Sequence, residues 1–120
     1  MTDWTVGTPI ALGDLPHAAA TYLEAHDVRD VPRALTAFEP DAQITDEGHT
    51  YHGVAEMGDW LANSASEWTY TSETISATRI DADHYDVIRH LEGNFPGGTA
   101  DLHFRFSFRG DAITGLVIEP

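Results

Sequence analysis

The sequence contains no cysteine and no lysine, and it has no hydrophobic run approaching the roughly 20 residues that span a bilayer. Without cysteine the chain can form neither a disulfide nor a thiolate metal site, and it has no thiol nucleophile. Its first residues also lack the basic region and the apolar stretch of a signal peptide. We therefore expect a cytoplasmic protein with no membrane partner.

Positive charge is scarce throughout the chain. Six basic residues, all arginine, stand against 20 acidic residues, which gives a formal net charge of −14. A charge of this size repels nucleic acid and anionic membranes, so we expect neither as a partner. The general interpretation of the excess carboxylates is a solvated surface.

The sequence also lacks the common signatures of cofactor-dependent enzymes. It has no glycine-rich phosphate loop, no serine nucleophile elbow and no dinucleotide-binding fingerprint. Proton transfer, addition of water and simple binding of a small molecule remain, and for these we expect no cofactor.

What is present fits one globular domain spanning residues 1–120. The hydrophobic share of 42% suits a single core, and no repeat or linker interrupts the chain. Residues 1–13 carry little pattern, and we interpret them as an N-terminal arm that packs through Trp4 or Ile10.

Apolar residues spaced three and four apart predict three helices in the first and middle parts of the chain. Asp14 is expected to cap the first helix, which runs to about His26, and Asp30 to cap the second, which Pro40 ends. The expected buried stripes are Leu15, Ala18, Ala19, Tyr22 and Leu23, then Val31, Ala34, Leu35 and Phe38, then Val54, Met57, Gly58 and Leu61 with Trp60 at the edge.

After Ser66 the apolar period changes from 3.6 residues to two, which is typical of strands. Long strands are expected from Trp68 to about Ile80, over residues 85–91, and on both sides of Gly110. Helices followed by a long antiparallel meander indicate an α+β fold, with the helices on the concave face of a strongly curved sheet. The space between the helices and such a sheet suits a small molecule.

The segment FEPDAQITDEGHTYHG, residues 38–53, places a carboxylate where a strand would face the interior. Ala42, Ile44 and Asp46 alternate with polar neighbours, so they share one face of a short strand that turns at Gly48. Asp46 is therefore either a general base in an apolar pocket or a cap for the turn that follows it.

In the order of these segments the chain resembles the SnoaL-like branch of the NTF2-like superfamily, which includes ketosteroid isomerases and polyketide cyclases. The resemblance covers about residues 14–120 and rests on YLEAHDVRDVPRALTAF, PDAQITDEGHTYHG, NFPGG and LHFRFSFRGDAITGLVIEP. It implies a cone-shaped fold with one apolar pocket per subunit, and a homodimer formed through the convex face of the sheet.

The resemblance to ketosteroid isomerase also implies catalytic residues. Asp46 matches the general base of that enzyme, and Tyr22, eight residues before Asp30, matches the tyrosine that stabilises the oxyanion. His103 is the residue nearest to the protonated acid that completes the site. Without the resemblance, Tyr22 is interpreted as a core tyrosine.

Other residues are candidates for binding the substrate. Trp60, Tyr70 and Phe95 could form the walls for a flat apolar ligand. Arg89, between Val87 and Leu91, would clamp an anion or pair with Asp46; the alternative is a strand face open to solvent or to a second subunit.

His49 and His52 form an HxxH pair, but no helix is expected there, so we predict no metal site. The sequence thus favours a cofactor-free acid–base enzyme, an isomerase, cyclase or hydratase, that acts on a small hydrophobic ligand. The alternative is a ligand-binding or assembly module without catalysis.

Overall fold

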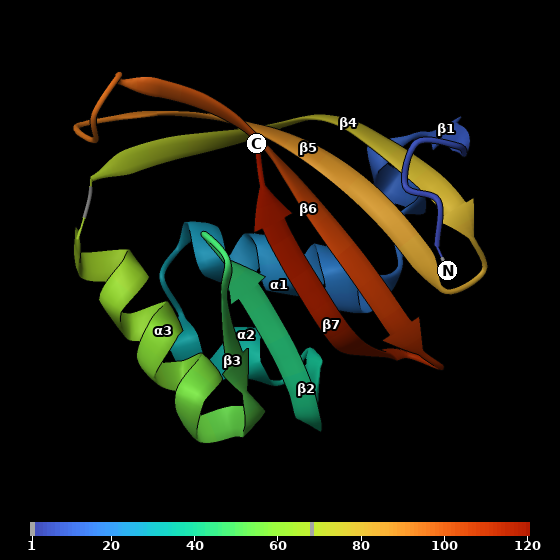
Figure 1. Cartoon of the computed structure of the whole chain (residues 1–120), viewed down its shortest axis with the longest axis horizontal. Coiled ribbons are helices and arrows are strands. Elements are labelled where there is room, and N and C mark those ends of the chain that lie inside the picture. Colours follow the sequence, from blue (N-terminus) through green and yellow to red (C-terminus); the bar gives the residue numbers. More distant parts are fainter. Residues whose placement is uncertain (1, 68) are drawn as a thin grey trace.

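The described residues form one seven-stranded sheet, with three α-helices packed against one of its faces (Figure 1). The computed structural model describes residues 2–67 and 69–120, without the side chains of residues 64–67. Trp68, which we expected to begin the first long strand, lies outside these residues. The helices are η1 (Leu12–Asp14, a 3₁₀ turn), α1 (His17–Asp27), α2 (Val31–Leu35) and α3 (Gly53–Glu67). The strands are β1 (Thr8–Ile10), β2 (Phe38–Asp46), β3 (His49–His52), β4 (Tyr70–Asp81), β5 (His84–Gly93), β6 (Thr99–Arg109) and β7 (Ala112–Glu119).

The sheet is mostly antiparallel, as predicted, and its strand order is β1-β4-β5-β6-β7-β2-β3. Strands β4 to β7 form a meander in which each strand pairs with the next along the chain. The β2–β3 hairpin joins this meander through a parallel pairing of β2 with β7. Figure 1 shows the long strands of the meander as bent ribbons, with α1 on the same side of the sheet as α2 and α3.

The core lies between the helices and one face of the sheet. Phe104, Phe106 and Phe108 of β6 are buried on that face, as their alternation with polar residues predicted. Tyr22 of α1 meets Phe106 and Phe38 edge-on, with ring centroids 6.0 and 5.4 Å apart. Aromatic contacts therefore hold the first helix against the sheet.

The predicted start of the first helix is wrong. Asp14 ends the 3₁₀ turn η1 instead of capping α1, which begins at His17 after Pro16. Leu15, the residue before the proline, has extended backbone angles, as proline imposes on its predecessor. The helix therefore cannot run back through this point.

The second helix is also shorter than predicted. Asp30 caps α2 as expected, accepting a hydrogen bond of 3.2 Å from the Arg33 amide. The helix ends at Leu35, and Phe38 begins β2 instead of extending the helical stripe. Pro40 falls within β2, where the pairing with β7 is irregular, so its missing N–H group breaks no regular ladder.

The third helix follows the hairpin directly. Gly53, with φ of +79°, makes the turn into α3, which buries Met57, Trp60 and Leu61 at helical spacing. Val54 was expected on this stripe but is 49% exposed. It follows β3, which is the edge of the sheet, so no further strand covers it.

The N-terminal arm packs through both of its expected anchors. Ile10 packs against the core from β1, a short strand that the sequence did not predict and that pairs with β4. Trp4 meets His84 edge-on and lies 5.9 Å from the Arg105 guanidinium. Among the described residues, no helix is long and apolar enough to cross a membrane.

Candidate functional site

A cavity of about 850 Å³ lies between α3, the β2–β3 hairpin and the end of the meander that carries the β5–β6 loop. This volume is in the range of pockets that hold small organic molecules. Its apolar walls are formed by Tyr51, Trp60, Tyr70, Leu91, Phe95, Pro96, Ala100, Leu102, Phe104 and Ile118. Its polar lining consists of His26, Asp46, Glu47, His49, Glu56, Asp59 and Asn63.

Asp46 lies in the wall of this cavity at the end of β2. It follows the strand parity of Ala42 and Ile44, both of which are buried. The indole N–H of Trp60 donates a hydrogen bond of 3.1 Å to Asp46 Oδ2. Because Trp60 is itself buried and packs on Tyr51, this bond orients the carboxylate beside an aromatic wall.

Tyr22 does not reach the cavity. Its side chain is 0% exposed and fills the core between Phe38 and Phe106, so the prediction that it shares the cavity with Asp46 is wrong. Burial raises the pKa of its phenol well above the ordinary value, and the group keeps its proton. The helical spacing correctly indicated a buried face but could not indicate how deep in the core this residue lies.

His26 and Tyr70, and not Tyr22, share the cavity with Asp46. Both line the cavity, and His26 Nε2 lies 2.9 Å from the Tyr70 hydroxyl. On the other side of the ring, His26 Nδ1 lies 3.5 Å from the Tyr22 hydroxyl. His26 was not predicted as a site residue; the available signal was its position four residues after Tyr22 on the same helical stripe.

Burial decides the protonation of this pair. It lowers the pKa of His26 to about 4, and the Arg89 guanidinium acts in the same direction. The imidazole is therefore neutral near pH 7. Burial also raises the pKa of Tyr70, so this phenol remains a hydrogen-bond donor.

Arg89 neither pairs with Asp46 nor lies on an open face of the sheet, which corrects these two interpretations; the anion that it holds is a carboxylate of the same chain. It is 3% exposed and donates two hydrogen bonds, of 2.8 and 2.7 Å, to the carboxylate of Asp27. A third bond of 3.1 Å goes to the Thr74 hydroxyl. This bidentate pair ties the end of α1 to β5, and Arg89 does not line the cavity.

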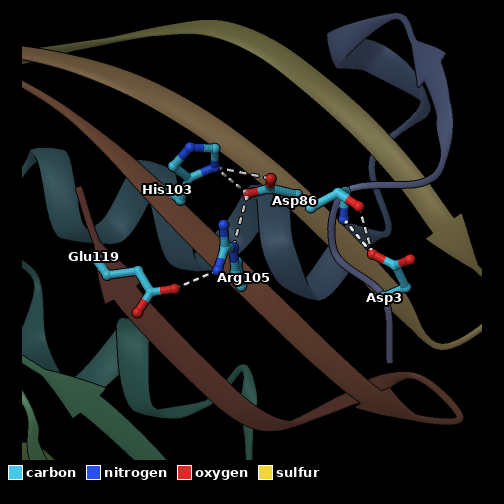
Figure 2. Close-up of polar contacts among 6 residues, drawn as sticks. Asp3, Asp86, His103, Arg105 and Glu119 are labelled. Carbon is cyan, nitrogen blue, oxygen red and sulfur yellow. Dashed lines mark hydrogen bonds and ion pairs between the residues drawn. The ribbon is translucent and has the colours of Figure 1, made fainter. Parts of the chain in front are cut away.

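His103, which the resemblance placed nearest to the acid that completes the site, lies on the face of the sheet away from the cavity, so its prediction as a residue that binds the substrate is wrong (Figure 2). Alternation along β6 turns it away from the face that buries Phe104. Its Nδ1 lies 2.8 Å from the carboxylate of Asp86, which is buried. Arg105 lies beside Asp86 and pairs with Glu119 on the same face.

The two histidines of the HxxH pair separate as strand geometry requires. Positions three apart on a strand face opposite sides, and only His49 lines the cavity. Within the part of the chain that the structure describes, no three histidine or acidic side chains come together as a metal site.

Solved structures show which fold this chain shares. A proposed polyketide cyclase from Sinorhizobium meliloti is 27% identical, with a TM-score of 0.85, over 92% of this chain and 100% of that one. A hypothetical protein of ketosteroid isomerase-like fold from Catenulispora acidiphila, in complex with trimethylamine, is 19% identical, with a TM-score of 0.77 over 88% and 85% of the chains. TerC co-crystallised with polyporic acid is 18% identical, with a TM-score of 0.74 over 85% and 87%. The chain has the NTF2-like fold. No family model matches the sequence, and the search among curated proteins found no match.

In this NTF2-like chain, the cavity combines groups suited to proton transfer. Asp46 supplies a carboxylate, and the neutral His26 and protonated Tyr70 supply hydrogen-bonding groups that line the same cavity. Trp60 and Phe95 contribute aromatic surface to the wall of the cavity. The arrangement can hold a flat apolar molecule while a carboxylate contacts it.

Proposed function

We propose that this protein is a cofactor-free enzyme that moves a proton on a small, largely hydrophobic ligand. Asp46 acts as the general base, and Trp60, Tyr70 and Phe95 form walls that hold the ligand. The observation that carries the proposal is the Asp46 carboxylate, which lines an aromatic cavity and is oriented by the Trp60 indole at 3.1 Å. A base fixed next to the bound molecule is what proton abstraction needs.

The similar structures support the choice of ligand. Two of them hold small molecules, trimethylamine and polyporic acid, and one is a proposed polyketide cyclase. A ligand with a carbonyl group next to a C–H bond fits a carboxylate base in an apolar wall, because loss of that proton gives a stabilised enolate. We therefore place carbonyl compounds first among the substrate classes.

The competing function is a container that binds the same ligand without catalysis. A carboxylate on the open surface would favour it, whereas Asp46 lies in the cavity wall and is partly buried. Tyr22, the second catalytic residue implied by the family resemblance, is too deep to touch a ligand. Catalysis therefore requires another donor for the developing oxyanion.

Exchange of a carbon-bound proton tests the proposal directly. We would incubate the protein with methyl naphthyl ketone in deuterated water and follow deuterium entry into the methyl group by NMR. The wild-type protein should accelerate exchange over buffer, and Asp46→Asn should reduce the enzymatic rate by about 100-fold or more, as loss of a general base does. Asn keeps the shape of Asp but cannot accept the proton.

The control for this substitution is Asp83→Asn. Asp83 is exposed in the turn between β4 and β5, away from the cavity lining, so the same change there should leave exchange unaffected. If the wild-type protein binds the ketone but exchange stays at the buffer rate, the container is the better description.

A further inference from the structure

We propose that Tyr70 donates the hydrogen bond that stabilises the substrate oxygen, and that His26 and Tyr22 are positioning residues that set the direction of its O–H bond. This inference rests on the proposed function, because it names the second catalytic group of the same cavity. It follows from the direction of the hydrogen-bond chain Tyr22–His26–Tyr70.

The hydrogen-bond chain begins at the hydroxyl of Tyr22, whose side chain is fully buried. Its hydrogen-bond partner among the described residues is Nδ1 of His26, at 3.5 Å. A buried O–H group that donates to nothing destabilises the fold, because it has lost its hydrogen bond to water without replacement. Donation from Tyr22 to Nδ1 avoids this cost, and Nδ1 must then be the unprotonated nitrogen.

The second link is the tautomer of His26. The ring is neutral near pH 7 because burial lowers its pKa to about 4. A neutral imidazole whose Nδ1 accepts carries its proton on Nε2. That N–H faces the Tyr70 oxygen at 2.9 Å, so His26 donates and Tyr70 accepts.

The third step concerns the Tyr70 O–H group, which is available to donate a hydrogen bond to the ligand. Its oxygen already accepts from His26, and its side chain lines the cavity that also contains Asp46. Hydrogen bonds in series polarise one another, which makes the last O–H a stronger donor. The Arg29 guanidinium lies 5.1 Å from the centre of the Tyr70 ring, and its positive charge favours negative charge developing on a bound oxygen.

Together these contacts complete the chemistry that Asp46 alone cannot perform. As the carboxylate of Asp46 takes the proton from carbon, the electron pair of the C–H bond moves into the enolate and the charge develops on oxygen. The Tyr70 hydroxyl stabilises that charge. The proton held by Asp46 either returns to carbon when the enolate collapses or first exchanges with solvent, and in deuterated water this exchange brings deuterium to the carbon. Atoms and electrons balance without any co-reactant.

The infrared stretch of the carbonyl group of bound methyl naphthyl ketone tests this donor separately from the base. The stretch should lie at lower wavenumber in the wild-type protein than in Tyr70→Phe, which removes only the hydroxyl. Tyr70→Phe should also slow deuterium exchange about 100-fold, as removal of one oxyanion donor does. Asp46→Asn should lose exchange but keep the lowered stretch.

Two substitutions of His26 test its role as a positioning residue. His26→Leu removes the link, so the stretch should move toward the Tyr70→Phe value although Tyr70 is still present. His26→Gln should restore part of the shift, because an amide can accept from Tyr22 and donate to Tyr70. A purely structural role would give the same stretch in both variants.

Tyr85→Phe is the matched control, because it removes a phenol that packs on Phe108 and does not line the cavity. An unchanged carbonyl stretch in Tyr70→Phe, with the ketone still bound, would overturn this inference and leave the role of Asp46 intact.

Failure of the wild-type protein to bind the ketone would overturn the proposed function, and this inference with it.

Discussion

His26 links the stability of the protein to the chemistry of its cavity. It is held between two tyrosines, with Nδ1 3.5 Å from one hydroxyl and Nε2 2.9 Å from the other. The charged groups that act on its ring are Arg89 and Arg29, which lower its pKa, and Asp27, which raises it. Burial outweighs all of them, so the fold contains a neutral imidazole.

The protein should therefore lose stability in mild acid through His26. The pKa is 6.5 in the unfolded chain and about 4 in the fold, so between these values only the unfolded chain binds the proton. The free energy of unfolding that the neutral His26 contributes is complete above pH 6.5 and is lost as the pH falls toward 4. At 1.4 kcal/mol per pKa unit, the loss is roughly 3 kcal/mol.

Urea unfolding at a series of pH values measures this contribution. His26→Gln should make the free energy of unfolding depend less on pH between 4 and 6.5 than it does in the wild-type protein. His52→Gln, at an exposed position of β3, should keep the wild-type dependence. Equal slopes for His26→Gln and the wild type would show that His26 is not buried in its neutral form.

At the scale of elements, the β2–β3 hairpin sets the position of Asp46. Asp46 pairs with His49, and the two residues between them, Glu47 and Gly48, have φ values of +52° and +78°. Positive φ at both central positions defines a type I′ turn, whose twist matches that of the strands. The turn thus keeps Asp46 in register with β7 and in the cavity wall.

Gly48→Ala should destabilise the protein by about 1 kcal/mol, because an L-residue pays this cost in the left-handed region. No neighbouring atom lies within 4 Å of an added methyl group, so the cost is conformational and not steric. Gly13→Ala is the control: it also has open space around it but no positive φ. Chemical denaturation compares the two, and equal effects would argue against strain at the turn.

At the scale of the whole molecule, the two faces of the sheet carry different chemistry. The helices cover the concave face, and the convex face carries the ionic cluster of Asp86, His103, Arg105 and Glu119 (Figure 2). The N-terminal arm covers part of this cluster, since Trp4 lies over Arg105. Ile88 and Val117, which pair with His103 and Arg105, are half-buried on the same face.

We propose that two chains associate through this convex face, where apolar and paired charged groups alternate and no helix of the described residues intervenes. Light scattering at micromolar concentration should give twice the mass of one chain, 13.2 kDa. Ile88→Glu should give the monomer, because it places an unpaired charge in the interface. Val28→Glu, on the helix side and already 66% exposed, should remain dimeric. A wild-type monomer would contradict the proposal.

The direction of some side chains at the site could be predicted from the alternation of residues along a strand. The alternation of Ala42, Ile44 and Asp46 determined which way the carboxylate faces, because side chains along a strand change sides at every residue. The same rule, applied to β6, separated Phe104 from His103. The cap at Asp30 and the α+β order of elements followed equally from local chemistry.

Only the tertiary structure decided which groups meet. His26 and Tyr70 are 44 residues apart, and Asp27 and Arg89 are 62 apart. The parallel pairing of β2 with β7 was equally invisible in the sequence. Periodicity determines the face of an element on which a side chain lies, but depth and partners depend on how distant elements pack. Tyr22 was therefore predicted on the correct face but at the wrong depth, and the group that reaches the cavity in its place comes from the other half of the chain.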